Sequence, residues 1–282
     1  MSAWLDVPDS RSRPLTTPTS QATAVALATI PNFRDTGGHE TRDGSRVRAR
    51  LLYRSVALDR ASDDDLAALA DLGVATVFDL RTALEQERRP DRLPAGAELV
   101  PLDVLAGSGE ADPAVVFALM QDPPRASVEL ADGGTDRFYM ASYRDMVRLP
   151  SARASYGHFY RALAQDGGAS LVHCTTGKDR TGWAVAALLL FLGVRADLVM
   201  REYLLSDAEI RAAFEPVVED FVARGGSRGV IEPMMSVRPG FLDAALDAIH
   251  ADHGSIEAYF SDGLGLDTAT SDVLRAKFLE RA

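Results

Sequence analysis

The segment HCTTGKDRTG, residues 173–182, places a cysteine six positions before an arginine, with a glycine between them. The short apolar stretch Ala169 to His173 predicts a buried strand before it, and an apolar helix is predicted to begin near Arg180. Backbone N–H groups in such a loop can curl inward and bind an anion, which the helix dipole also favours. The same setting lowers the pKa of a thiol, so we expect Cys174 to be a thiolate near neutral pH.

Arg180 can close this loop over a phosphate with two parallel N–H···O bonds, a geometry that lysine does not offer. A thiolate facing a bound phosphoryl group, with an arginine for the transition-state charge, describes phosphoryl transfer through a phosphocysteine. The predicted phosphate site consists of Thr175, Thr176, Gly177, Lys178, Asp179 and Arg180. The alternative is an ordinary buried cysteine. The flanking His173, Gly177, Thr181 and Gly182 make a chance match rarer than about one in several thousand.

Cys174-x5-Arg180-Thr181 resembles the signature of protein tyrosine phosphatases, and the full HCTTGKDRTG resembles a bacterial subgroup of the mycobacterial secreted tyrosine phosphatase B type. Four further segments are similar to the same group: NFRDTGG (32–38), LLYRS (51–55), FDLRT (78–82) and EAYFSDGLGL (257–266). The resemblance implies that Cys174 is the nucleophile and Arg180 the phosphate clamp. It implies that the Thr181 hydroxyl assists the departing thiolate and that His173 orients the loop. For Thr181 the alternative is local hydrogen bonding in a first helical turn.

The general acid has three candidates. Cleavage of a phosphoester needs a proton on the leaving oxygen, an effect of about 10² to 10⁴ in rate. The resemblance implies that Asp179, inside the loop, is this acid. Its alternative role is a helix N-cap, a position where aspartate is favoured. Asp79 and Asp103, at predicted strand ends, are the rival acids.

Lys178 is one of only two lysines in the chain. It adds positive potential at the mouth of the predicted pocket, or else it is a solvated loop charge. Lipid phosphatases also have a lysine at this position, often with another directly after the cysteine, where this chain has Thr175. Arg81 and Arg34 are candidates for the pocket wall, and the alternative for both is pairing with structural carboxylates.

The elements around the loop predict an α/β fold with a central, mostly parallel sheet flanked by helices, of the cysteine-phosphatase type. Ser62 with Asp65 predicts a capped helix to Leu72, and Gly73 ends it. The predicted strands are 51–53, 74–80, 98–102 and 169–173, and the predicted helices are 62–72, 138–148, 152–165 and 181–192. The last third reads as helical to Ala282, with a break at 225–227. We predict one phosphatase domain, 22–282, after a disordered tail, 1–21, with a loop-rich insertion, 103–135, and a helical lid within 197–236.

Composition limits the partners. The chain has 282 residues and a net charge of −11, which argues against nucleic-acid binding and requires a local basic pocket for an anionic substrate. A single cysteine and five scattered histidines predict neither a disulfide nor a metal site built on these residues, and we expect no cofactor, with an all-carboxylate metal site as the alternative. The longest aliphatic run, Leu188 to Leu192, is too short for a membrane span. A cytoplasmic location is expected, with export that needs no cleaved signal as the alternative.

The predicted function is a phosphatase acting on phosphotyrosine, with phosphoprotein or phosphoinositide substrates as a broader range. A phosphoinositide phosphatase is the main alternative. A rhodanese-like sulfurtransferase also uses a loop cysteine, but such loops are usually shorter and lack this Gly-Lys-Asp-Arg-Thr-Gly run. A phosphate-binding module without catalysis is the third alternative, and it would ordinarily have lost Cys174 or Arg180.

Overall fold

The structure is a computed structural model that describes residues 27–108, 113–165 and 167–281. The predicted tail, residues 1–21, lies outside the described residues. In these three ranges no helix is both long enough and apolar enough to cross a bilayer.

A five-stranded sheet lies at the centre of the fold. Its order is β1 (Arg34–Asp35), β3 (Leu52–Ser55), β6 (Ala169–His173), β4 (Val74–Asp79) and β5 (Glu98–Pro101). All neighbours pair in parallel except β1, which is antiparallel at one edge. A second, two-stranded sheet pairs β2 (Arg46–Val47) with β7 (Leu279–Glu280). The mostly parallel sheet is confirmed, while β7 corrects the expectation that the last third is entirely helical.

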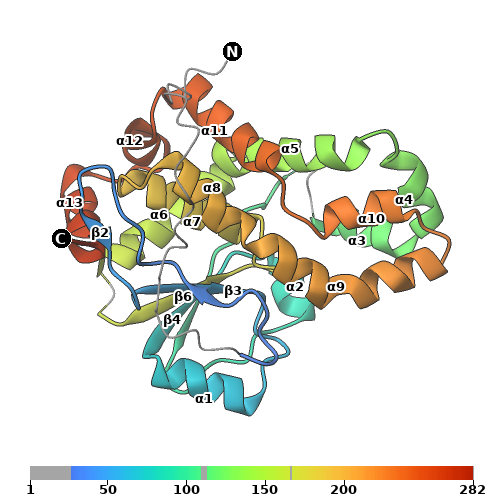
Figure 1. Ribbon diagram of the computed structural model, residues 1–282, viewed down its shortest axis with the longest axis horizontal. Coiled ribbons are helices and arrows are strands. Elements are labelled where there is room, and N and C mark those ends of the chain that lie inside the picture. Colours follow the sequence, from blue (N-terminus) through green and yellow to red (C-terminus); the bar gives the residue numbers. More distant parts are fainter. Residues whose placement is uncertain (1–26, 109–112, 166, 282) are drawn as a thin grey trace, which may run out of the picture.

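Alternation of side chains along the strands divides the core into two layers. Tyr53, Val77 and Leu171 lie in one buried cluster, and Leu52, Phe78 and Val172 lie in the other. This is the two-residue period of a sheet that is covered on both faces. Helix α1 (Asp63–Asp71) covers the first face, and α6 (Pro150–Gln165) with α7 (Arg180–Phe191) covers the second (Figure 1).

Most of the other helices complete the second layer and extend it to one side (Figure 1), while Ile210 and Phe214 of α9 pack in the first cluster. They are α2 (Ala83–Arg88), α3 (Pro113–Gln121), α4 (Pro123–Glu129), α5 (Gly134–Arg148), α8 (Ala196–Leu204), α9 (Ser206–Ala223), α10 (Arg228–Met234), α11 (Pro239–His253), α12 (Ile256–Ala258) and α13 (Thr268–Phe278), with a π-helical turn at Tyr259–Gly263. The predicted break at 225–227 separates α9 from α10 and is confirmed.

The insertion 103–135 differs from the prediction, because it contains α3 and α4 and is not simply loop-rich. Pro123-Pro124 suggested a loop, yet the pair begins α4, with the Asp122 side chain accepting from the N–H of Arg125. Proline is well tolerated in a first helical turn, where its missing N–H would have had no helical partner. A Pro-Pro pair therefore marks a boundary here, and the element after it is a helix.

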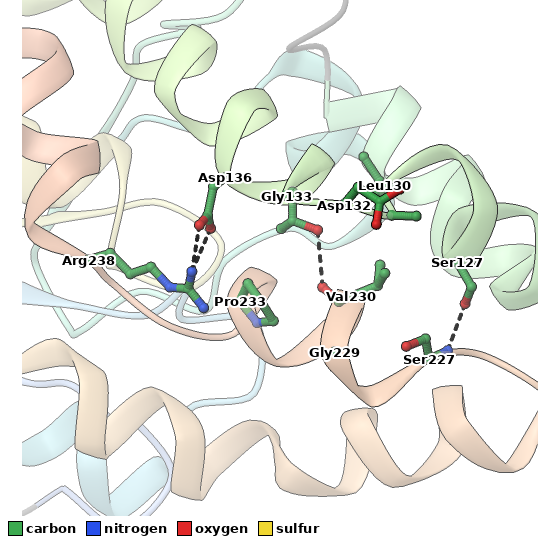
Figure 2. A pocket seen from close by; sticks show the side chains of 12 residues that line it. Ser127, Leu130, Asp132, Gly133, Asp136, Ser227, Gly229, Val230, Pro233 and Arg238 are labelled. Atoms are coloured by element: carbon green, nitrogen blue, oxygen red, sulfur yellow. Dashed lines mark hydrogen bonds and ion pairs between the residues drawn. The ribbon is translucent and has the colours of Figure 1, made fainter.

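Helix α10 is tied to α4 and the start of α5 by contacts around a cavity of about 360 Å³ (Figure 2). The Ser227 N–H donates to the Ser127 hydroxyl at 2.7 Å, and the Thr135 hydroxyl donates to the Val230 carbonyl at 3.3 Å. An ion pair of 2.6 Å joins Arg238 to Asp136 at the cavity edge. These contacts position α10 beside the insertion helices.

The carboxyl ends of three strands meet at one edge of the sheet. β6 lies between β3 and β4, so His173 pairs with Ser55 on one side and with Asp79 on the other. Cys174 directly follows β6 at this edge. Loops after parallel strands gather on that side of a sheet, which is where α/β proteins bind their ligands.

Candidate active site

The loop after β6 has its carbonyl groups turned outward. Asn32 Nδ2 donates to the Gly177 carbonyl at 3.0 Å, and Arg54 Nη2 donates to the same oxygen at 2.7 Å. Among the described residues, none of the backbone N–H groups of 175–179 donates to a protein acceptor. A row of free N–H groups beside a helix N-terminus is the anion site that the sequence predicts.

Gly177 is required in this loop for two reasons. Its φ is +65°, in the left-handed region where a Cβ is unfavourable, and an added Cβ would lie 2.0 Å from the Ser55 carbonyl oxygen. The loop therefore packs directly against the end of β3, with no room for any side chain at this position.

Cys174 is buried and is the only cysteine. Burial raises the pKa of its thiol, but the charge of Arg180 and hydrogen bonds from the side chain and N–H of Thr181 outweigh burial, and the net shift is downward. The Thr181 hydroxyl is buried beside the thiol, and its interaction with the sulfur is one of the causes that lower the pKa of Cys174. This geometry fits the predicted thiolate and the predicted role of Thr181 beside it.

Glu85 holds Arg180, and the sequence analysis did not select it. The two carboxylate oxygens accept from Nη1 at 2.6 Å and from Nη2 at 2.9 Å, a bidentate pair. The carboxylate also accepts from the Thr175 hydroxyl and from the N–H of Thr82. Burial raises the pKa of Glu85, but the charge and hydrogen bonds of Arg180 lower it further than burial raises it. The local signal was the capping box Thr82-x-x-Glu85, which opens α2 and points this carboxylate at the loop.

Asp179 makes no N-cap hydrogen bond, so its alternative role as a cap is not what the structure shows. One carboxylate oxygen lies 2.6 Å from Lys178 Nζ, and the other accepts from the Tyr143 hydroxyl at 3.1 Å. The Tyr143 and Tyr203 hydroxyls are 2.7 Å apart. Burial raises the pKa of both phenols well above the usual value, which keeps them neutral donors.

Lys178 is buried, which contradicts the alternative of a solvated loop charge. Its Nζ also lies 4.3 Å from the centre of the Tyr139 ring. Burial lowers the pKa of Lys178, but the charge of Asp179 raises it more, so the ammonium is retained. An ammonium on a ring face and beside a carboxylate is held in place.

The rival acids Asp79 and Asp103 are engaged elsewhere. The Asp79 carboxylate accepts from Arg81 Nε at 2.9 Å and from Arg81 Nη2 at 2.8 Å. The Asp103 carboxylate accepts from the Ala83 N–H at 3.0 Å, at the start of α2. Asp179 is thus the carboxylate among the three candidates that lines the cleft over the loop.

Arg81 and His173 belong to a buried cluster under the loop. Arg81 Nη2 lies 2.6 Å from Asp91, and His173 Nε2 lies 3.2 Å from the same carboxylate. His173 Nδ1 lies 3.2 Å from the Cys174 carbonyl, the backbone contact expected of it. Asp79, Asp91 and His173 offer three clustered ligand atoms, but the Arg81 guanidinium already pairs with both carboxylates, so the cluster is not suited to a metal ion. Arg81 thus lines the cleft, as one reading predicted, and also pairs with structural carboxylates, as the alternative predicted.

Arg34 also pairs with a structural carboxylate instead of entering the pocket. Its Nε lies 2.8 Å from Glu202, and Glu202 also binds Arg54 at 2.9 Å. Burial lowers the pKa of Arg34 to about 10. Because Arg54 donates to Gly177, this three-residue cluster supports the outer side of the loop from α8.

A cleft of about 380 Å³ lies over the loop, with Thr175, Thr176, Lys178, Asp179 and Arg180 at its base. Its walls are largely apolar and come from α2, α3, α5, α9, α10 and the residue after α10: Leu84, Val116, Phe117, Met120, Phe138, Tyr139, Met146, Phe214, Val217, Met234 and Met235. Within the range predicted as a lid, Phe214 and the two methionines face the cleft, whereas Tyr203 and Phe221 are buried in the core. Movement of these helices stays a prediction.

Comparison with known proteins agrees with this geometry. A family model described as the tyrosine phosphatase family matches residues 25–280. A Cupriavidus necator protein, provisionally named a tyrosine-protein phosphatase, is 36% identical over 248 residues, 87% of this chain and 85% of that protein. The triple specificity protein phosphatase PtpB of Mycobacterium tuberculosis is 30% identical over 276 residues, 88% and 96% of the two chains. A tyrosine-protein phosphatase of Nostoc commune is 30% identical over 230 residues, 76% and 69%. The chain belongs to the tyrosine phosphatase family.

Proposed function

We propose that this enzyme hydrolyses phosphotyrosine in proteins through a phosphocysteine formed on Cys174. The observation that carries the proposal is a buried thiol of lowered pKa at the start of the loop that forms the base of an apolar cleft. Free backbone N–H groups surround it, and Arg180 is fixed beside it by Glu85. This arrangement binds a phosphate dianion and presents a nucleophile to its phosphorus atom.

Arg180 has donors left for the substrate. Its Nε has no partner among the described residues, and its Nη2 bond to the Thr175 hydroxyl is long, at 3.3 Å. A phosphate can therefore take Nε and the Nη2 hydrogen now shared with Thr175, while Glu85 keeps the guanidinium plane in place. This is the bidentate contact that only arginine provides.

The reaction proceeds in two displacements. The Cys174 sulfur attacks phosphorus, the bond to the tyrosine oxygen breaks, and Asp179 gives that oxygen a proton. A water molecule then attacks the phosphocysteine, Asp179 takes the proton back, and the Thr181 hydroxyl stabilises the departing thiolate. The free N–H groups and Arg180 carry the charge on the phosphoryl oxygens in both steps.

A broader substrate range, including phosphoinositides, is the second candidate. The apolar walls of the cleft support it, because they suit an acyl-bearing or aromatic group as well as a tyrosine ring. The M. tuberculosis relative is named for triple specificity. A cytoplasmic location and the absence of nucleic-acid partners stay predictions.

Replacing the nucleophile tests the mechanism. Cys174→Ser keeps the N–H groups and Arg180, so vanadate and phosphate should still bind while hydrolysis of a phosphotyrosine peptide is abolished. Parallel assays on phosphotyrosine, phosphoserine and phosphoinositide substrates, with EDTA present, define the range. Retained anion binding is the control for folding, and substantial hydrolysis by the purified serine variant would exclude the covalent mechanism.

A further inference from the structure

Five cationic side chains line the cleft, and four of them have a carboxylate partner. Arg180 pairs with Glu85, Lys178 with Asp179, Arg81 with Asp79 and Asp91, and Arg89 with Asp59. Arg88 is the fifth, and in the described part of the chain no carboxylate pairs with it. Among the described residues Arg88 is therefore the one cation of the cleft lining without an acidic partner, in a chain with 41 acidic and 30 basic residues.

The position of Arg88 follows from that of Glu85. Both lie on α2, three residues apart, so they share one face of the helix with Cβ atoms about 5–6 Å apart. Glu85 contacts Arg180 at the base of the cleft, and Arg88 is therefore one turn further along, toward the rim. A substrate whose phosphate reaches Arg180 brings its neighbouring groups close to Arg88.

The Arg88 side chain is held over an aromatic ring. Its Cζ lies 4.5 Å from the centre of the Phe117 ring on α3, and Phe117 is 50% exposed. A guanidinium stacked on a ring face keeps its edge N–H groups available for a planar anion. An exposed phenylalanine at this place is explained by the same contact, since it orients the arginine.

We propose that Arg88 is a specificity-determining residue that selects phosphotyrosine sites with an aspartate or glutamate beside the phosphotyrosine. The inference rests on the proposed phosphotyrosine activity. An extended peptide advances about 3.3 Å per residue, so a flanking carboxylate within a few positions of the phosphotyrosine spans the interval from Arg180 to Arg88. The carboxylate and the Arg88 edge then form the pair that this arginine lacks in the free enzyme.

Two phosphotyrosine peptides that differ only in their flanking residues, glutamate in one and glutamine in the other, provide the test. The wild-type enzyme should prefer the glutamate peptide by up to about fivefold in kcat/KM at low salt, the effect of an exposed ion pair. The preference should fall at 0.5 M salt because exposed charges are screened. Arg88→Gln should abolish the preference, and Arg88→Glu should invert it when a lysine-flanked peptide is compared with the glutamate peptide. Arg60→Gln is the control, since Arg60 is 80% exposed and does not line the cleft.

The outcomes separate this proposal from the one on which it rests. An enzyme that hydrolyses neither peptide, nor p-nitrophenyl phosphate, contradicts the phosphotyrosine activity itself. An enzyme that hydrolyses both peptides with the same kcat/KM, or an Arg88→Gln variant that keeps the wild-type preference, overturns the role of Arg88. If Arg88→Gln changes phosphoinositide hydrolysis and leaves the peptide preference intact, Arg88 recognises a lipid headgroup and the peptide proposal is wrong.

Discussion

Arg180 depends on its shape as much as on its charge. Glu85 takes one edge of the guanidinium and leaves Nε with the far side of Nη2 for the substrate. Arg180→Lys keeps the charge, but an ammonium has no two N–H edges to share between Glu85 and the substrate phosphate. We therefore expect kcat for a phosphotyrosine peptide to fall at least about 10²-fold. Arg195→Lys, an exposed site outside the cleft, is the matched control. A near-normal kcat in Arg180→Lys would mean that another residue carries the transition-state charge.

Asp179 is tested through the leaving group. A tyrosine oxygen needs a proton to leave, whereas p-nitrophenolate leaves readily without one. Asp179→Asn should therefore slow phosphotyrosine hydrolysis by about 10² to 10⁴ and p-nitrophenyl phosphate hydrolysis far less. It should also flatten the alkaline limb of the pH–kcat profile, where an acid loses its proton. If Asp179→Asn slowed the hydrolysis of both substrates equally and left the alkaline limb of the pH–kcat profile unchanged, Asp179 would be a structural residue and not the acid.

Tyr143 should act through Asp179, as a positioning residue. Tyr143→Phe removes the hydroxyl that donates to the Asp179 carboxylate. We expect a smaller loss of hydrolysis rate than in Asp179→Asn, and again a larger loss for phosphotyrosine than for p-nitrophenyl phosphate. Tyr160→Phe is the control, because the Tyr160 hydroxyl is equally buried and donates to the Ala184 carbonyl away from the loop. If Tyr160→Phe also slowed phosphotyrosine hydrolysis more than p-nitrophenyl phosphate hydrolysis, the effect would come from a general loss of packing and not from the contact of Tyr143 with Asp179.

Sequence patterns located the residues of the loop but not those that hold it. Cys174, Lys178, Asp179 and Arg180 lie within seven consecutive residues, so one motif contains them all. Glu85, Arg54, Asn32 and Tyr143 reach the loop through space from four other segments. Asn32 and Arg54 lie in the segments NFRDTGG and LLYRS, which resemble the family, and Glu85 lies in a capping box, but none of these signals indicates a contact with the loop.

At the scale of elements, periodicity and turn residues predicted most strands and helices, because these are local properties. The strand order was not predictable in this way. β3 and β4 are joined by α1 and suggest adjacent strands, yet β6, almost a hundred residues later, lies between them. The central position of β6 is decisive for the site, since it brings Cys174 between the ends of β3 and β4. Helices α3 and α4 of the insertion 103–135 were not predicted, because a proline pair and glycines mark boundaries without showing what lies between them.

The contact between the loop and β3 can be tested with one methyl group. Gly177→Ala meets the Ser55 carbonyl at 2.0 Å and also takes an unfavourable φ of +65°. Gly44→Ala is the matched control, since Gly44 has φ +86° but no atom within 4 Å of an added Cβ. The control should lose about 1–2 kcal/mol of unfolding free energy from the left-handed backbone alone.

Gly177→Ala should lose clearly more than Gly44→Ala in chemical denaturation, and it should lose vanadate binding as well, because the loop must move away from β3. Similar losses in both variants, with anion binding retained, would mean that the loop and β3 separate easily. The close contact would then not be what shapes the phosphate site.

At the scale of the whole molecule, one buried cluster joins the sheet to the chemistry. Asp79 ends β4, His173 ends β6, and Asp91 follows α2 and accepts from the Leu58 N–H after β3. With Arg81 the cluster holds two carboxylates and one permanent cation, so a protonated His173 makes it neutral. Burial lowers the pKa of His173, but the hydrogen bond to Asp91 and the charges of Asp79 and Asp91 raise it more, and the net pKa is raised above 6.5.

A raised pKa makes stability depend on pH in a defined direction. The folded protein binds this proton more tightly than the unfolded chain, so the stabilisation is fully present below about pH 6.5 and is lost as pH rises through the folded pKa. The unfolding free energy from urea denaturation should therefore fall between pH 6.5 and the folded pKa. Asp91→Asn removes the main cause of the shift and should flatten this slope. It should also lower stability at all pH values, by about 3–5 kcal/mol for a broken buried pair.

The difference between wild-type and Asp91→Asn profiles isolates the cluster from other groups, among them His39, whose pKa burial lowers. His173→Gln provides an independent variant, which keeps both carboxylates and removes the titrating ring. Its unfolding free energy should show the same flat pH profile as that of Asp91→Asn if His173 is the group responsible. His173 contacts the Cys174 carbonyl through Nδ1 and Asp91 through Nε2, and neutral imidazole keeps one N–H, so loss of the proton removes one of these two donors. If both variants kept the wild-type dependence of unfolding free energy on pH, the titrating group would lie outside the cluster. The stability of the sheet would then not depend on the protonation of His173.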